Sequence, residues 1–110
     1  MSLKLNSKKG LIENYEVFAE GQLIGRFAIA PILDNTQYYL FNVRATGPKG
    51  SGTKMMRDIV GRFNDKPIAL DVLESNKKAI RLYEKFGFKS VYFWSNPNDE
   101  IYIEMIREVK

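Results

Sequence analysis

Apolar and polar residues follow strand-like patterns through the first part of the chain. Two β-rich runs, residues 15–19 and 23–29, flank a tight glycine turn, a pattern that predicts a β-hairpin. Residues 38–43 are dense in aromatic and branched side chains and predict a third strand. The polar segment ahead of them, residues 1–10, leaves room for a short edge strand around residues 3–5.

Two later segments carry apolar residues at the spacing of an α-helix. The first helix is predicted over about residues 53–64, with an apolar face made of Met55, Met56, Ile59, Val60 and Phe63. The second follows a short apolar strand at residues 68–72, and its apolar stripe consists of Ala79, Leu82, Tyr83 and Phe86. Asn76 can cap its first turn, and Gly87 suits the left-handed residue that often ends a helix.

A second hairpin is predicted near the end of the chain, from residues 89–94 and 101–107. The elements then follow the order β-β-β-α-β-α-β-β, with no internal repeat and no linker. A chain of 110 residues is expected to form one domain, residues 1–110. The predicted fold class is α/β, built in layers around a mixed, mostly antiparallel sheet.

Composition excludes several kinds of active site. The chain has no cysteine and no histidine, which rules out thiolate nucleophiles, histidine bases and most zinc sites, so no metal site is expected. A cysteine-free chain suits a reducing cytoplasm. The net charge of +4 favours an anionic partner, such as a phosphate-bearing cofactor or nucleic acid. The longest apolar run, residues 27–33, is split by Pro31 and is too short to cross a bilayer.

Residues 70–88 carry a motif. They resemble the last β-α unit of the GNAT superfamily of acyl-CoA N-acyltransferases, whose members often read L-x-V-x-x-x-N-x-x-A-I-x-L-Y-E-K-x-G-F. The matching residues are Leu70, Val72, Asn76, Ala79, Ile80, Leu82, Tyr83, Glu84, Lys85, Gly87 and Phe88. The resemblance covers roughly residues 38–107. It implies a GNAT-like fold with acetyl-CoA (coenzyme A) as the cofactor.

The glycine-rich loop before the first helix is a candidate phosphate site. Glycines let backbone N–H groups approach a ligand, and the first N–H groups of a helix lack partners and lie at the positive end of its dipole. The N–H groups are expected from Gly50, Ser51, Gly52 and Thr53, and the positive charge from Lys49 and Lys54, with Arg57 as a further candidate. The resemblance implies that this loop binds the CoA pyrophosphate, although Gly47 stands where the family has Arg or Gln and Ser51 where an aliphatic residue is common. The alternative is a plain structural turn.

The resemblance also implies roles for residues around this loop. Backbone groups of Phe41, Asn42 and Val43 are expected to pair with the pantetheine amides like an added strand. Asn76 is expected to reach the pantetheine arm or an ordered water as well as capping its helix. Tyr83 is expected to act as general acid and protonate the departing thiolate, a role that suits a phenol in an apolar slot. The alternative for Tyr83 is a core tyrosine with a satisfied hydroxyl.

Transfer to an amine also requires a base, or a water chain leading to one. Without histidine the candidates are carboxylates, namely Asp71, Glu74, Glu104, Asp99 and Glu100. Glu74 is preferred because it follows a strand at the point where a βα loop opens a crevice; the alternative is a solvated surface glutamate. The basic residues of the second helix are interpreted as a solvated face, with the CoA 3′-phosphate or a nucleic-acid backbone as alternative ligands. These residues are Lys77, Arg81 and Lys85.

One part of the family pattern is missing. Full family members carry a strand and two helices before the first hairpin, and those helices usually form the wall that selects the acceptor. Only about a dozen residues precede Tyr15, too few for that region at about 1.5 Å rise per helical residue. Three expectations stay open: a large acceptor brings its own surface, a second subunit completes the cleft in a homodimer, or catalysis has been lost.

The leading hypothesis is an acetyl-CoA-dependent N-acetyltransferase that moves an acetyl group to a primary amine by direct transfer. The acceptor would be a small molecule or a protein. One alternative is a non-catalytic CoA-binding or protein-interaction module on the same fold. A small basic nucleic-acid-binding protein is a less favoured alternative, and no membrane partner is expected.

Overall fold

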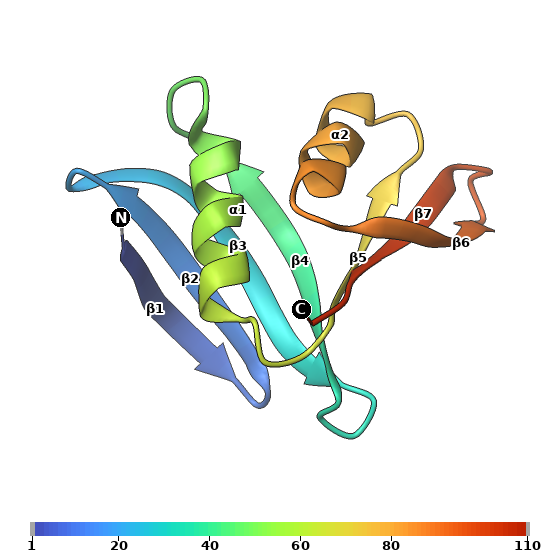
Figure 1. Ribbon diagram of the computed structural model, residues 1–110, viewed down its shortest axis with the longest axis horizontal. Helices are drawn as coiled ribbons and strands as arrows, with labels where there is room; N and C mark the ends of the chain where they lie inside the picture. The colour runs from blue at the N-terminus through green and yellow to red at the C-terminus, as the bar shows by residue number, and fades with distance from the viewer. Residues whose placement is uncertain (1, 110) are drawn as a thin grey trace.

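In the part of the chain that the structure describes, seven strands form one sheet in the order β1-β2-β3-β4-β5-β7-β6 (Figure 1). The computed structural model describes residues 2–109. Its elements are β1 (Ser2–Lys9), β2 (Ile12–Ala19), β3 (Gln22–Ile32), β4 (Gln37–Ala45), α1 (Ser51–Arg62), β5 (Ile68–Leu73), α2 (Lys77–Lys85), β6 (Lys89–Ser95) and β7 (Ile101–Arg107). Neighbouring strands are antiparallel except β4 and β5, which are parallel. The predicted mixed, mostly antiparallel sheet is confirmed.

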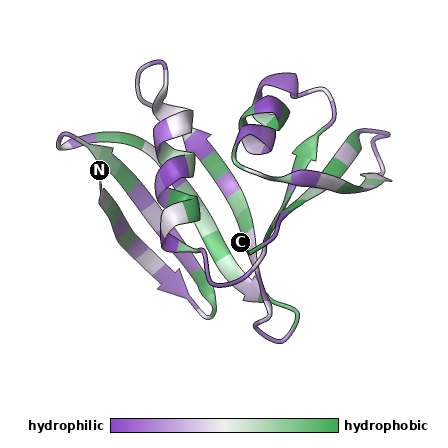
Figure 2. Cartoon of the chain, viewed as in Figure 1, coloured by the Kyte–Doolittle hydropathy of each residue, from purple (hydrophilic) through white to green (hydrophobic). Residues whose placement is uncertain are grey.

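Both helices pack on the same face of the sheet, with α1 across β3 and β4 and α2 beside α1. Phe63, just past the end of α1, packs edge-on against Tyr15 and Tyr38, with ring centroids 5.8 and 5.3 Å apart. Tyr83 of α2 and Leu70 of β5 belong to the same buried cluster. Because side chains alternate between the two faces of a strand, hydrophobic and hydrophilic positions are interleaved along the strands (Figure 2).

The N-terminal segment differs from the sequence expectation. Residues 1–10 were expected to hold at most a short edge strand, but β1 is eight residues long and pairs with β2 from Ser2↔Phe18 to Lys9↔Ile12. Leu3 packs against the core from this edge, and the exposed lysines of β1 are the kind of residue that keeps an edge strand from pairing with another chain. The structure therefore adds one strand to the predicted order, which holds from β2 onward.

The ends of the two helices follow from local chemistry. The first helix was predicted over residues 53–64, but α1 begins and ends two residues earlier. Gly50 adopts a left-handed φ of 94° and is the N-cap residue, so the helix starts directly after it. At the start of α2 the Asn76 side chain accepts a hydrogen bond from the Ala79 N–H at 3.2 Å, as predicted. Gly87, with φ of 93°, provides the predicted left-handed stop.

The parallel strands β4 and β5 separate soon after they meet. Their only Cα partners are Tyr38↔Ile68 and Tyr39↔Ala69. Asn42 adopts φ of 52° at a register shift between β3 and β4, a bulge of the kind that bends a strand. The C-terminal ends of β4 and β5 therefore diverge, and α1 and α2 follow from the two diverging arms (Figure 1). We call this divergence beyond Tyr39 the fork.

Two other kinds of feature are not found in the described part of the chain. Neither α1 nor α2 is long and apolar enough to cross a membrane. Within residues 2–109, acidic side chains do not gather in groups of three or more that could hold a metal ion.

Candidate functional site

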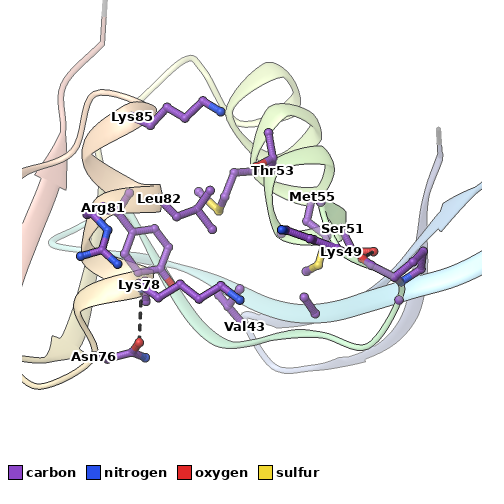
Figure 3. A pocket seen from close by; sticks show the side chains of 18 residues that line it. Val43, Lys49, Ser51, Thr53, Met55, Asn76, Lys78, Arg81, Leu82 and Lys85 are labelled. Atoms are coloured by element: carbon purple, nitrogen blue, oxygen red, sulfur yellow. Dashed lines mark hydrogen bonds between the residues drawn. The ribbon is translucent and has the colours of Figure 1, made fainter.

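A pocket of about 640 Å³ lies at the fork, on the face of the sheet that the helices cover (Figure 3). One wall comes from the end of β4, the following loop and the start of α1, and the other wall comes from α2. The lining residues are Val43, Ala45, Gly47, Pro48, Lys49, Gly50, Ser51, Gly52, Thr53, Met55, Met56, Asn76, Lys78, Ala79, Arg81, Leu82, Tyr83 and Lys85. The structure thus brings the predicted phosphate loop and the helix of Tyr83 to one cavity.

The loop before α1 presents free backbone N–H groups to this pocket. No side chain caps the start of α1, and no hydrogen bond within residues 2–109 uses the N–H of Gly52 or Thr53. The positive end of the α1 dipole coincides with these groups. A helix start with unpaired N–H groups is suited to binding an anion such as a diphosphate.

Ser51 and Gly47, the two departures from the family loop, have structural reasons. The N–H and the hydroxyl of Ser51 both donate to the carbonyl of Pro48, at 3.0 and 2.6 Å. Ser51 therefore stabilises the turn and, contrary to expectation, does not offer its N–H to a ligand. At Gly47 a Cβ atom would lie 2.5 Å from Ser51 Oγ and 3.0 Å from Ile24 Cα. The Arg or Gln common in the family cannot be accommodated there without moving the backbone.

Four exposed cations form the rim of the pocket: Lys49, Lys78, Arg81 and Lys85. Lys78 and Lys85 extend from α2 toward the α1 side (Figure 3). The ion pairs of residues 2–109 are Lys8–Glu13 and Arg26–Glu16, so none of the rim cations has an acidic partner. Their positive charge adds to the attraction of the α1 start for anions.

The sequence pattern already contained a signal for this rim. The basic residues of α2 were interpreted as a solvated face, with the CoA 3′-phosphate or a nucleic-acid backbone as alternative ligands. Lys78, Arg81 and Lys85 each directly precede a residue of the apolar stripe. On a helix this places them along one flank of the buried face, which is the flank that borders the pocket.

Tyr83 lies in the buried apolar floor of the pocket with Met55 and Met56. Its side chain is only 9% exposed, and burial raises the pKa of its phenol above the ordinary value, so the hydroxyl is protonated at neutral pH. The tyrosine hydroxyls that donate hydrogen bonds within residues 2–109 are those of Tyr15, Tyr38 and Tyr39. The Tyr83 hydroxyl is therefore available to a ligand.

Of the three predicted contacts in β4, only Val43 lines the pocket. Phe41 lies on the opposite face, where its ring stacks on Tyr39 at 5.7 Å. Asn42 forms the bulge and lines a separate hollow. The prediction concerned backbone groups, however, and beyond Tyr39 the edge of β4 that faces β5 has no strand partner. That edge is open to an extended ligand that adds like a strand.

The structure places the predicted helix cap at the pocket but not the predicted base. Asn76 lines the pocket, whereas Glu74 does not, and the Glu74 N–H donates to the carbonyl of Ile101 at 2.9 Å. Asp71 and Glu104 are cross-strand partners on β5 and β7, and neither lines the pocket. Asp99 and Glu100 are likewise absent from its lining.

Sequence reasoning missed the partners of Asp71. Its carboxylate accepts hydrogen bonds from the Tyr39 hydroxyl at 2.6 Å and from the Trp94 indole Nε1 at 2.9 Å. These residues lie far apart in the chain, and only the pairing of the sheet brings them together.

Comparison with known proteins agrees with this geometry. A family model described as "Acetyltransferase (GNAT) family" matches residues 6–88, whereas no curated protein sequence matches significantly. The aminoglycoside acetyltransferase AAC(6')-Ib, solved in complex with coenzyme A and kanamycin, is 25% identical, with a TM-score of 0.75. The match covers 89% of this chain and 67% of that one. The match to AAC(6')-Ib in complex with ribostamycin and coenzyme A covers 64% of the length of that chain.

Two further structures share the fold at lower identity. The ribosomal-protein-S18-alanine N-acetyltransferase from Escherichia coli is 20% identical, with a TM-score of 0.74 over 94% of this chain and 72% of its own. The N-acetyltransferase PseH from Campylobacter jejuni is also 20% identical, with a TM-score of 0.73 over 93% and 71%. The family resemblance seen in the sequence is confirmed. Because the family model matches most of the length of this chain, the chain belongs to the acetyltransferase (GNAT) family.

Proposed function

We propose that this chain binds acetyl-CoA in the pocket and transfers the acetyl group directly to a primary amine. The observation that carries the proposal is the division of the pocket into a cationic rim with free N–H groups and a buried apolar floor at Tyr83. Acetyl-CoA is divided in the same way, with phosphates at one end and a thioester at the other. The 25% identity to AAC(6')-Ib, whose structure contains coenzyme A and kanamycin, supports this assignment.

Each group in the pocket then has a defined task. The N–H groups of Gly52 and Thr53 and the rim cations hold the phosphates. The open edge of β4 near Val43 orients the extended pantetheine amides. Tyr83 donates its phenolic proton to the sulfur as the new C–N bond forms and the C–S bond breaks, and it regains a proton from solvent. The amine proton passes to water, because neither Glu74 nor any other candidate carboxylate lines the pocket.

The acceptor is proposed only as a primary amine. The solved relatives differ in this respect: one contains kanamycin, and another acts on the alanine of a ribosomal protein. A fold shared by such different acceptors does not select one of them.

The proposal is tested by calorimetry followed by a turnover assay. The chain should bind acetyl-CoA, and it should bind S-acetyl-cysteamine, a fragment with the thioester but no phosphates, far more weakly. Release of free thiol is then followed with a panel of an aminoglycoside, spermidine and a peptide with a free N-terminus. Absence of acetyl-CoA binding at millimolar concentration would overturn the proposal. Binding without turnover on any amine would support a non-catalytic CoA-binding module instead.

A further inference from the structure

Asp71 ties three strands together on the face of the sheet that carries no helix. One carboxylate oxygen, Oδ2, accepts a hydrogen bond from the Tyr39 hydroxyl of β4, and the other, Oδ1, accepts one from the Trp94 indole of β6. Both donors are braced by neighbouring rings, since Tyr39 stacks on Phe41 at 5.7 Å and Trp94 stacks on Tyr102 at 4.6 Å. Hydrogen bonds to a carboxylate are stronger than hydrogen bonds between two neutral groups.

This link lies at the base of the fork. Tyr39 is the last residue of β4 that pairs with β5, through Ala69. Beyond it, β4 leads to Val43 and the phosphate loop, while β5 leads to Asn76 and α2. The hydrogen bond from Tyr39 to Asp71 therefore joins the two arms where they part, and the arms beyond it form the two walls of the pocket.

We propose that Asp71, held by Tyr39 and Trp94, is a positioning residue that sets the separation of the two pocket walls and thereby the affinity for coenzyme A. This inference rests on the proposed function. None of the three side chains lines the pocket, so they act through the backbones of β4 and β5. A small rotation of β4 relative to β5 at the base of the fork produces a larger displacement of the two pocket walls at its far end. Coenzyme A contacts both walls at once, so its affinity depends on the distance between them.

The Tyr39 hydroxyl keeps its proton across the pH range of an ordinary assay. Burial, and then the hydrogen bond to Asp71, raise the pKa of the Tyr39 phenol above its ordinary value. The hydroxyl therefore stays a donor at neutral and moderately alkaline pH. Changes in CoA affinity over that range would have to come from other groups.

The test compares two pairs of matched variants in the full chain. Tyr39→Phe removes the hydroxyl that donates to Asp71, and its control Tyr102→Phe removes a hydroxyl from the same face that donates no hydrogen bond within residues 2–109. Asp71→Asn weakens the acceptor, and its control Glu104→Gln alters the residue paired with it across the sheet. Both test variants should weaken CoA binding by about 5- to 20-fold, as typical coupling energies imply, and both controls should stay within about twofold.

The fluorescence of Trp94 offers a second measurement. If the hydrogen bonds of Asp71 only stabilised the fold, CoA binding would not change this fluorescence. Trp94 is the only tryptophan in the chain and lies outside the pocket, so its fluorescence reports on the link and not on direct contact with the ligand. Saturating CoA should change the Trp94 emission of the wild-type chain, with the same dissociation constant as calorimetry gives. In Tyr39→Phe this response should be lost or strongly reduced.

The outcomes distinguish a failure of the proposed function from a failure of the positioning role of Asp71. If the wild-type chain binds no CoA, the proposed function falls and this inference falls with it. If the wild-type chain binds CoA but Tyr39→Phe and Asp71→Asn bind it as tightly as their controls, only the role of Asp71 is overturned. An unchanged Trp94 emission at saturation, or an effect confined to one of the two test variants, would also overturn it.

Discussion

Tyr83 and Phe88 are connected twice across the end of α2. The N–H of Phe88 donates to the carbonyl of Tyr83 at 3.1 Å, and the two rings lie with centroids 5.7 Å apart. Gly87, between α2 and Phe88, makes the reversal possible through its left-handed φ. The position of the Tyr83 ring is thus fixed by how the helix ends, and its hydroxyl is left free for the pocket.

The first prediction concerns Tyr83→Phe. The ring and its packing are retained, so acetyl-CoA affinity measured by calorimetry should change by less than about twofold. The proton donor to the leaving thiolate is lost, and the turnover rate should fall by about 100-fold or more, the usual range for general acid catalysis. An unchanged rate would remove Tyr83 from the mechanism.

The pH dependence provides an independent check on the same residue. Because burial raises the Tyr83 pKa above 10.0, the acid stays protonated through neutral and mildly alkaline pH. Deprotonation of Tyr83 should therefore lower the rate with a midpoint above pH 10.0. A decline at lower pH that disappears in Tyr83→Phe would contradict the raised pKa.

The second prediction concerns Gly87→Ala. A Cβ at this position would meet only Arg107, at an ordinary 3.8 Å, so the cost comes from the left-handed backbone and not from crowding. The free energy of unfolding should fall by about 1–2 kcal/mol. Gly61→Ala is a matched control, because Gly61 lies within α1 with open space around it, and this change should stabilise the chain by about 0.5–1 kcal/mol. Urea denaturation of both variants measures the difference.

Patterns local in sequence predicted the helices well, and contacts across the sheet were not predictable. Apolar spacing located α1 and α2 because each helix buries one stripe, such as Met55 and Ile59 in α1. The start of α1 was placed two residues late because the effect of Gly50 as a left-handed cap depends on the turn before it. The link from Tyr39 to Asp71 spans 32 residues, and no local pattern encodes which strands become neighbours.

The candidate site was likewise predictable where it depends on local sequence and not predictable where it depends on the path of the chain in space. The glycine loop and Asn76 were identified from local chemistry and motif, and the structure brings them to one pocket. The use of the Ser51 N–H within its own turn was not visible, because it depends on the exact path of the loop. Glu74 was favoured from its place after a strand, but the connection from β5 to α2 leaves it outside the pocket lining.

The third prediction concerns the cationic rim. Lys78→Gln removes a charge at the pocket, whereas Lys77→Gln removes a charge from the neighbouring position, which does not line it. Lys78→Gln should weaken acetyl-CoA binding by about 3- to 10-fold at low ionic strength, and the difference should shrink as salt screens the charge. Calorimetric titrations at two salt concentrations measure both effects. If both variants lose the same acetyl-CoA affinity, the effect comes from the net charge of the chain and not from the position of Lys78 at the pocket.

The last prediction concerns alkaline unfolding and Tyr38. Burial, followed by the hydrogen bond that its hydroxyl donates to Asp65, raises the Tyr38 pKa from 10.0 to about 12. Between these values the unfolded chain has lost the phenolic proton while the folded chain still holds it, so the folded state binds more protons and stability falls as pH rises. This contribution is fully present below pH 10.0 and disappears as pH approaches about 12.

Urea denaturation from neutral pH to about 12, followed by circular dichroism, should show this decline. Tyr38→Phe should lower stability at neutral pH by about 1 kcal/mol, the typical net value of one hydrogen bond. The same variant should show a shallower decline above pH 10.0, because it has no proton to lose at this position. Identical alkaline slopes for the two chains would show that Tyr38 does not hold its proton more tightly in the folded state. The decline would then come from the other tyrosines with raised pKa values, Tyr15, Tyr39 and Tyr83.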